Sequence, residues 1–360
     1  MIRPVEARIN LRALEHNLQQ IQRHAPQSKV LAIIKANGYG HGMTRVARAL
    51  NSADGFGVAS FEEAVGLRDA GISQPVMLLS GFLEAAELPL IARQQLWVTV
   101  HHPFQVEMLE RTPLPEPITV WLKIDTGMHR LGIAPEQVRS LWQRLQDLDW
   151  VRKPIGLMTH FACADERDNA MTREQITRFD AAVNDLPGDR SLANSAGILA
   201  WSDSQRHWIR PGIVLYGASP FAGAPARDLG LQPVMTLKSK LISIHFVKRG
   251  EAIGYGATWI CPEDMLVGIV AMGYGDGYPR HAKPGTPVLV AGRRVPLIGR
   301  VSMDSLFVDL RSYAEAQIGD SVVLWGDELP VEEVAVCANT IPYELLCKVT
   351  GRVKFSAAME

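Results

Sequence analysis

The sequence predicts a (β/α)8 barrel followed by a β-rich domain, and two changes of pattern along the chain support this prediction. Between residue 30 and about residue 217, short apolar, β-rich runs alternate with helix-like segments, which is typical of βα units on a parallel sheet. After about residue 228, strand patterns follow one another with few helices between them. The eight runs that would close the barrel are 30–35, 56–60, 76–80, 97–101, 118–125, 155–161, 191–195 and 208–216.

Helix start signals separate these runs. Ser60 with Glu63, and Thr172 with Gln175, have the spacing of a capping box, and Asn10 is a suitable N-cap for a helix whose apolar stripe begins at Leu11. An open, doubly wound sheet is the alternative arrangement. It is disfavoured because no Gly-x-Gly-x-x-Gly motif follows the first strand.

The same patterns divide the chain into three parts. Apolar Val5, Ala7 and Ile9 alternate with charged residues, so we expect residues 1–10 to form a strand that joins the C-terminal domain. Residues 11–228 would form the barrel and residues 229–360 the β-rich domain. The strands expected in that domain are 235–247, 265–272, 288–290, 295–301, 306–310 and 322–325.

Composition narrows the classes of function. The 37 basic and 38 acidic residues nearly cancel, which argues against nucleic acid or an anionic membrane as a partner and favours a small molecule. No segment reads as a signal peptide or a membrane span. The four cysteines lack Cys-x-x-Cys spacing, so we expect a cytoplasmic protein without disulfides or structural zinc.

A lysine stands where the first barrel strand meets a glycine-rich loop, at Lys35 in the sequence KANGYGHG. An amine at the wall of an apolar pocket is driven toward its neutral form, which condenses with carbonyl groups. The loops after strands seven and eight, at 194–197 and 210–213, have the place and composition of a barrel phosphate site. Together these features indicate pyridoxal 5′-phosphate as the cofactor.

Several motifs, in order along nearly the whole chain, resemble those of the alanine racemase family. They are residues 35–42, 123–132, 159–161, 194–196, 210–217, 254–259, 273–280 and 299–304. The resemblance implies a barrel and a β domain, a homodimer with shared active sites, and interconversion of L-alanine and D-alanine for peptidoglycan synthesis. Gly38 departs from the family pattern, in which alanine is more common, and we expect it to loosen the loop slightly.

The resemblance also assigns roles to residues. Lys35 would carry the cofactor covalently and act as the base for the D-enantiomer, while Tyr255 from the partner subunit would act on the L-enantiomer from the opposite face. Arg210 would donate a hydrogen bond to the pyridine nitrogen and leave it largely unprotonated. His160 and Arg210 would help Tyr255 to act as a base, because nearby positive charge favours a phenolate.

The remaining positions would bind the cofactor and substrate. The resemblance assigns phosphate binding to Tyr39, Ser195, Gly212, Ile213 and Tyr343. It assigns the substrate carboxylate to Arg130 and to the backbone of Met303, and the entrance to Tyr274 and Asp304. Lys123 corresponds to a lysine that is often carbamylated in the family, where the resulting anion orients the arginine corresponding to Arg130.

Three other functions compete with racemisation. A metal-dependent amidohydrolase would use a modified Lys123 with histidines, but the His-x-His motif expected on its first strand is absent. A non-catalytic carrier of pyridoxal phosphate would not need Tyr255. A decarboxylase of the same fold type would carry a cysteine-bearing C-terminal signature, which is not evident, and Arg210 disfavours strong carbanion delocalisation. We therefore expect no metal.

Overall fold

The computed structural model describes residues 3–358 and contains a closed barrel of eight parallel strands, as the sequence predicted. The strands pair in chain order, and the last strand closes on the first through Lys29 with Trp208 and Val30 with Ile209. Their bounds are β2 Lys29–Ile33, β3 Gly55–Val58, β4 Val76–Leu78, β5 Trp97–Val100, β6 Ile118–Lys123, β7 Val151–Met158, β8 Arg190–Asn194 and β9 Trp208–Arg210.

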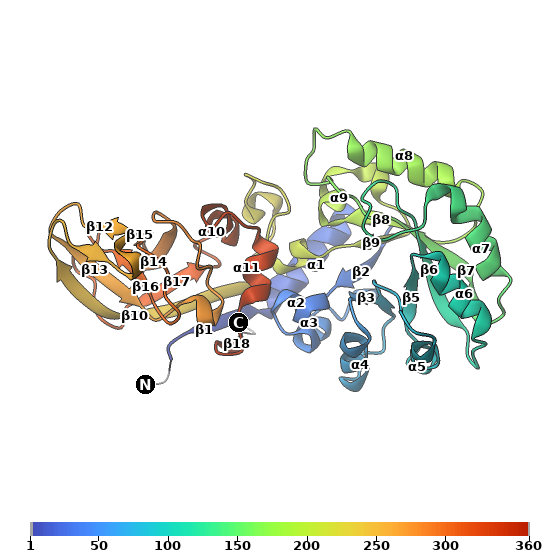
Figure 1. The fold of residues 1–360 in the computed structure, drawn as a ribbon, viewed down its shortest axis with the longest axis horizontal. Coiled ribbons are helices and arrows are strands. Elements are labelled where there is room, and N and C mark those ends of the chain that lie inside the picture. The colour runs from blue at the N-terminus through green and yellow to red at the C-terminus, as the bar shows by residue number, and fades with distance from the viewer. Residues whose placement is uncertain (1–2, 359–360) are drawn as a thin grey trace. The chain divides into compact units, whose positions relative to one another are not determined.

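Helix α1 precedes the first barrel strand, and the helices α2 to α9 come between or after the barrel strands (Figure 1). They are α1 Leu11–His24, α2 Lys35–Tyr39, α3 Met43–Ala49, α4 Phe61–Asp69, α5 Leu88–Arg93, α6 Pro103–Arg111, α7 Val138–Gln146, α8 Met171–Val183 and α9 Ser195–Ala200. The prediction of a capping box at Thr172 is wrong, because α8 begins one residue earlier and Thr172 is a buried residue inside the helix. At Ser60 the hydroxyl accepts a hydrogen bond from the Glu63 amide at 3.3 Å.

Tryptophans pack together toward the amino ends of the barrel strands. The ring centres of Trp97 and Trp208 lie 5.3 Å apart, and that of Trp121 lies 6.1 Å from Trp97. Gly156 on β7 leaves room for this packing, since a Cβ there would come within 2.3 Å of the Trp121 ring. The aromatic cluster fills this end of the barrel and leaves the carboxyl ends of the strands for chemistry.

A second sheet is mainly antiparallel and combines the start of the chain with its C-terminal part. Its strand order is β13-β16-β15-β14-β17-β10-β1-β18. Strand β1 pairs antiparallel with β10 and parallel with β18, so its backbone amides and carbonyls have partners on both edges, while Ala7 and Ile9 are buried on one face of the sheet. The bounds are β1 Glu6–Asn10, β10 Met235–Val247, β13 Met265–Val270, β14 Pro287–Val290, β15 Arg293–Ile298, β16 Leu306–Asp309, β17 Ser321–Trp325 and β18 Lys354–Ala358.

Shorter elements complete this part of the chain. They are the hairpin strands β11 Ala252–Ile253 and β12 Trp259–Ile260 and the helices α10 Val331–Cys337 and α11 Pro342–Lys348. By contact density, the chain forms two compact units: residues 18–38 with 42–215, and residues 1–17 and 39–41 with 216–360. The domain boundaries expected from the sequence, at residues 10 and 228, remain our proposal.

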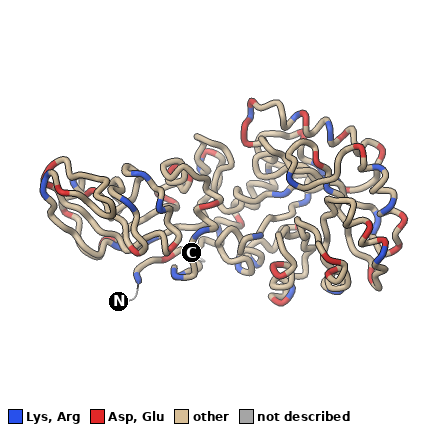
Figure 2. Tube along the Cα trace, in the orientation of Figure 1, with Lys and Arg blue, Asp and Glu red and all other residues tan. Residues whose placement is uncertain are grey.

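Charged residues of both signs are interspersed along the chain (Figure 2). Within residues 3–358, no helix combines the length and apolar character that a membrane crossing requires. The same residues hold no group of three or more His, Cys, Asp or Glu side chains placed to hold a metal ion.

Candidate active site

Lys35 lies two residues after the first barrel strand, and the backbone after it turns the opposite way from an ordinary helix. Ala36, Asn37, Gly38 and Tyr39 have φ values of 53°, 54°, 62° and 49°. This left-handed conformation costs about 1–2 kcal/mol for each residue that carries a Cβ. Gly38 avoids that cost, so the structure gives it a role as strain relief rather than the loosening expected from the sequence.

Lys123, at the end of β6, lies within a group of cationic side chains. Burial, and after it the positive charges of Arg210, Arg130 and Lys35, lower the pKa of Lys123 to about 8 against the opposing effect of Asp125. These four basic groups therefore interact at the carboxyl ends of the barrel strands. Such an excess of positive charge favours binding of an anion.

Arg210, the last residue of β9, is fixed by backbone oxygens. Its guanidinium donates to the carbonyls of Ser191 at 2.9 Å, Thr159 at 2.5 Å and Leu192 at 3.1 Å, and to Ser191 Oγ at 2.5 Å. Burial lowers the pKa of Arg210 to about 10, so it stays protonated at neutral pH. The side chain is thus a rigid donor that cannot act as a base near pH 7.

His160 lies two residues beyond β7, and its Nδ1 is 3.5 Å from the Arg210 guanidinium. Burial lowers the pKa of His160 well below its usual value, and the charges of Arg210, Lys123, Arg130 and Lys35 act in the same direction. The imidazole is therefore neutral at physiological pH, so the positive charge expected to help Tyr255 would come from Arg210 and not from His160.

A buried polar network behind His160 was not anticipated from the sequence. The Gln175 amide donates to the His160 carbonyl at 3.0 Å and to Thr126 Oγ1 at 3.1 Å, and its oxygen accepts from the Ala162 amide at 2.9 Å. Thr126 Oγ1 lies 2.8 Å from Thr159 Oγ1. The network joins α8 to the loops after β6 and β7.

The two loops expected to bind phosphate meet in the barrel. Ser195 Oγ, after β8, accepts a hydrogen bond from the Gly212 amide, after β9, at 2.9 Å. Ser195, Gly212 and Ile213 are all buried. Asn194 caps α9 by accepting from the Gly197 amide at 2.9 Å, which fixes the direction of Ser195.

Arg130 is exposed in a loop that Asp125 holds in shape. The Asp125 carboxylate accepts from the amides of Gly127 at 2.9 Å and His129 at 3.0 Å. A Cβ at Gly132 would come within 2.5 Å of the Asp125 amide nitrogen, so the loop packs closely here. The backbone of this loop is therefore fixed, whereas the exposed side chain of Arg130 has room to turn toward a ligand.

Tyr39 and Tyr343 belong to the second compact unit and lie near each other there. The Tyr39 ring stacks on Tyr216 with centres 4.7 Å apart, and its centre is 6.0 Å from that of Tyr343. Burial raises the pKa of Tyr39 above its ordinary value, with smaller contributions from Tyr343 and Cys347. The Tyr39 hydroxyl therefore keeps its proton at neutral pH and can donate a hydrogen bond.

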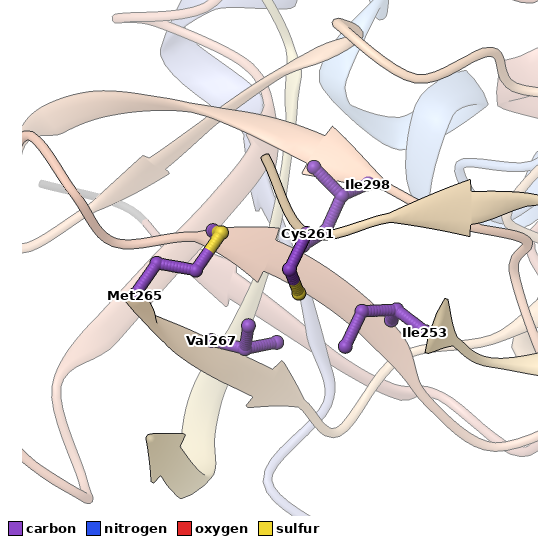
Figure 3. Close-up of a cluster of buried hydrophobic side chains, with 5 residues drawn as sticks. All are labelled: Ile253, Cys261, Met265, Val267 and Ile298. Carbon is purple, nitrogen blue, oxygen red and sulfur yellow. The ribbon is translucent and has the colours of Figure 1, made fainter. Parts of the chain in front are cut away.

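Tyr255 is presented on the β11–β12 hairpin, and its side chain is 70% exposed. The base of the hairpin is anchored in a buried apolar cluster of the second unit (Figure 3). That cluster consists of Ile253, Cys261, Met265, Val267 and Ile298. Packing at the base thus holds a tyrosine in solvent at the tip.

Tyr274, Met303 and Asp304 lie in two loops of the second unit that hydrogen-bond to each other. The Tyr274 amide donates to the Ser302 carbonyl at 3.0 Å, and the Gly275 amide donates to that of Met303 at 2.9 Å. The side chain of Met303 is 52% exposed.

Ion pairs connect these two loops to both ends of the described chain. Asp276 is fully buried and pairs with Arg3 at 2.5 Å and Arg352 at 3.5 Å. Asp304 pairs with Arg352 at 2.5 Å and Arg3 at 3.5 Å. We call these four residues the β-domain ion network.

The structure therefore brings five of the predicted residues together at the carboxyl ends of the barrel strands: Lys35, Lys123, Arg130, His160 and Arg210. Ser195 and Gly212 meet within the same unit. The roles predicted for all site residues stay predictions, as do those of Tyr39, Tyr255, Tyr274, Met303, Asp304 and Tyr343 in the second unit.

The chain combines a parallel barrel with a mainly antiparallel β domain, and basic side chains gather at the carboxyl ends of the barrel strands. These features define a class of two-domain barrel enzymes. Residues 9–220 match the family model "Alanine racemase, N-terminal domain", and residues 234–357 match "Alanine racemase, C-terminal domain". The chain belongs to the alanine racemase family.

Individual relatives cover nearly the whole chain. An alanine racemase of Vibrio cholerae is 52% identical over 97% of both chains. The crystal structure of the biosynthetic alanine racemase from Pseudomonas aeruginosa has a TM-score of 0.97 and 47% identity, with 99% of each chain covered. The alanine racemase from Bartonella henselae, described with covalently bound pyridoxal phosphate, has a TM-score of 0.90 and 28% identity over 99% of each chain.

Proposed function

We propose that the protein interconverts L-alanine and D-alanine with pyridoxal 5′-phosphate. The observation that carries this proposal is the group of four interacting cations at the barrel mouth, one of which is a lysine at a strand end. A phosphorylated cofactor and a carboxylate substrate would supply the negative charge that this group favours. The cofactor of the Bartonella henselae relative is of this chemistry.

The side chains present fit such a cofactor. Ser195 and the buried amides of Gly212 and Ile213 would bind the phosphate, together with the hydroxyls of Tyr39 and Tyr343. Arg210 would donate to the pyridine nitrogen, since it is a fixed, protonated donor. When bound, the cofactor withdraws electrons from the substrate α-carbon and so makes its C–H bond more acidic.

Racemisation then requires proton transfer on two faces of the substrate. Lys35 would exchange the α-proton on one face and Tyr255 on the other, because one group cannot readily remove a proton from one side and return it to the opposite side. Arg130 and the Met303 backbone amide would hold the substrate carboxylate. Tyr274 and Asp304 would border the entrance and favour a small side chain.

Tyr255 would come from a second copy of the chain in a homodimer. This proposal is supported by the exposure of two apolar side chains assigned to the site, 70% for Tyr255 and 52% for Met303. Exposed apolar surface of this kind is available for burial against a second copy of the chain.

Lys123 would react with carbon dioxide to form a carbamate. Only a neutral amine reacts in this way, and a pKa of about 8 leaves a substantial neutral fraction near neutral pH. The resulting anion would reduce the local excess of positive charge and orient Arg130.

We further propose that the enzyme acts in the cytoplasm and supplies D-alanine for peptidoglycan. All four cysteines are free thiols, which fits a reducing compartment. The Pseudomonas aeruginosa structure is described as biosynthetic, which supports the direction of this role.

The proposal is tested with L-alanine in deuterium oxide, using chiral separation and mass measurement. The wild type should yield α-deuterated D-alanine and show a visible absorption band from the bound cofactor. Lys35→Ala should lose the covalently attached cofactor and at least about 10³-fold in kcat, because it removes both the attachment point and one base. The exposed Lys283→Ala should behave like the wild type.

Failure to exchange the α-proton, with the cofactor still attached, would refute racemisation and favour a carrier. Release of carbon dioxide from an amino acid would instead identify a decarboxylase.

A further inference from the structure

We infer that Glu63 is a positioning residue for Lys35, which its carboxylate holds in place through the backbone. The inference rests on the proposed function in one respect, since it takes Lys35 to be the reactive lysine. Glu63 lies in the first turn of α4, and it was expected only to help begin that helix.

The backbone after Lys35 needs an external restraint. Ala36 and Asn37 carry Cβ atoms in the left-handed conformation, at φ values of 53° and 54°. Such residues relax to other conformations unless surrounding bonds hold them. Relaxation of Ala36 would swing the adjacent Lys35 side chain away from its present direction.

Glu63 provides this restraint with both carboxylate oxygens. Oε1 accepts the Ala36 amide at 2.7 Å, and Oε2 accepts the Ala59 amide at 2.8 Å. Ala36 follows Lys35, and Ala59 directly follows β3. One carboxylate therefore ties the lysine turn to the end of the neighbouring barrel strand.

The way Glu63 departs from a capping box supports this interpretation. Ser60 Oγ accepts the Glu63 amide at 3.3 Å, which is one half of the box. In the other half, the glutamate would bond to the Ser60 amide. Within residues 3–358, the carboxylate bonds instead to Ala36 and Ala59. A residue that leaves its expected local partner for one beside a reactive group points to a functional constraint.

The electrostatic setting strengthens both bonds. Glu63 lies at the N-terminal end of α4, where the partial positive charge of the helix favours a carboxylate. Hydrogen bonds from amides to an ionised carboxylate are stronger than bonds between neutral groups. Loss of the charge should therefore weaken the restraint even where the shape of the side chain is kept.

The experiment compares Glu63→Ala and Glu63→Gln with the wild type and with Glu62→Ala and Glu62→Gln. Glu62 is the matched control because it is exposed, occupies the preceding position of α4, and carries the same charge. Hydrogen exchange of single amides, read by mass spectrometry on cofactor-free protein, reports the restraint directly. The rate of acetylation at Lys35 reports the exposure and reactivity of its amine.

In Glu63→Ala, the amides of Ala36 and Ala59 should exchange at least about tenfold faster while the other barrel strands stay unchanged. The rate of Lys35 acetylation should differ from that of the wild type. The kcat for alanine should fall about tenfold while KM stays within about twofold, because the lysine acts in the proton transfer. Glu63→Gln keeps one acceptor oxygen and should protect only one of the two amides. The Glu62 variants should match the wild type.

Exchange of Ala36 at the wild-type rate in Glu63→Ala would overturn the inference, as would faster exchange throughout the barrel, which would indicate general destabilisation. If Glu63→Ala does not fold, the exchange rates of Ala36 and Ala59 in Glu63→Gln, which preserves side-chain volume, decide the inference. A wild type that bound no cofactor or racemised no alanine would refute the proposed function. The exchange and acetylation results would still decide the role of Glu63.

Discussion

The barrel mouth and the β-domain ion network both concentrate charge, but they balance it in opposite ways. The network pairs Arg3 and Arg352 with Asp276 and Asp304, so its formal charges cancel. At the mouth, Lys35, Lys123, Arg130 and Arg210 act together on one another with Asp125 as the opposing charge. Balanced charge serves to hold loops in place, whereas unbalanced charge is available for a ligand.

The two regions also differ in backbone conformation. The mouth keeps consecutive residues in a left-handed turn, and it needs Glu63 to restrain them. The loops of the ion network are instead joined by backbone hydrogen bonds between residues 274–275 and 302–303. The first region therefore holds unfavourable free energy in the cofactor-free state, and the second contributes stability.

The largest expected effect comes from removing the centre of the balanced network. Asp276→Ala would remove the shorter of the two ion pairs of Arg3 and leave the Gly273 amide, 3.0 Å from Asp276 Oδ2, without this acceptor. We expect a loss of about 3 kcal/mol in the free energy of unfolding, measured by urea denaturation. Asp304→Asn, at the exposed end of the network, should change much less. Equal losses for the two variants would break the distinction between buried and exposed partners.

An intermediate effect, of the opposite sign, is expected at the mouth. Lys123→Met should stabilise the cofactor-free protein at pH 7, because the folded state binds the Lys123 proton less tightly than the unfolded state does, with a pKa of about 8 against 10.5. In the wild type, unfolding should become less favourable as pH rises from about 8 to 10.5, by at most about 3 kcal/mol. Below pH 8 the lysine is charged in both states and the penalty is constant.

Urea denaturation at several pH values, in buffers free of carbon dioxide, measures this slope. Lys123→Met should remove it, and the exposed Lys283→Met should keep it. A slope that persists in Lys123→Met would show that another group causes it and that the mouth is not the source of the penalty.

The smallest effect tests backbone strain. Gly38→Ala should lower the free energy of unfolding by about 1 kcal/mol or slightly more, since its φ is 62° and a new Cβ would lie 3.0 Å from Val46 Cγ2. Gly71→Ala is the control for φ alone, because Gly71 has a φ of 81° with nothing within 4 Å of its Cβ position. A smaller loss at Gly38 than at Gly71 would mean that the turn after Lys35 is less strained than its dihedral angles indicate.

Much of the fold could be predicted because short apolar runs and intervening helices repeat at regular spacing. The strand ends were less predictable. The last barrel strand ends at Arg210, since Pro211 lacks an amide to continue the ladder, although apolar residues run on to Tyr216. The sixth barrel strand, β7, begins at Val151 and not at the predicted residue 155, because Pro154 made its first half look unlike a strand.

The candidate site was predictable where its residues stand at the ends of strands, as Lys35, Lys123 and Arg210 do. Its supporting residues were not. Glu63 and Gln175 lie on helices, where a polar residue ordinarily indicates a cap or a solvent face. The pairing of Arg3 with Asp276 spans 273 positions and leaves no local pattern. The left-handed conformation of Ala36 opposes its own preference, so only tertiary contacts reveal it.

The tryptophan cluster at the amino ends of the barrel strands bears on how this chain can change over evolutionary time. Trp97, Trp121 and Trp208 provide close packing in a part of the barrel remote from the reactive strand ends. Such packing supplies a reserve of stability above the threshold for folding, and that reserve lets a strained, like-charged mouth persist. Tolerance to mutation should therefore differ between the two regions. A substitution at the mouth that the wild type tolerates would prevent folding in a variant whose aromatic cluster has been weakened, although the aromatic cluster touches no reacting group.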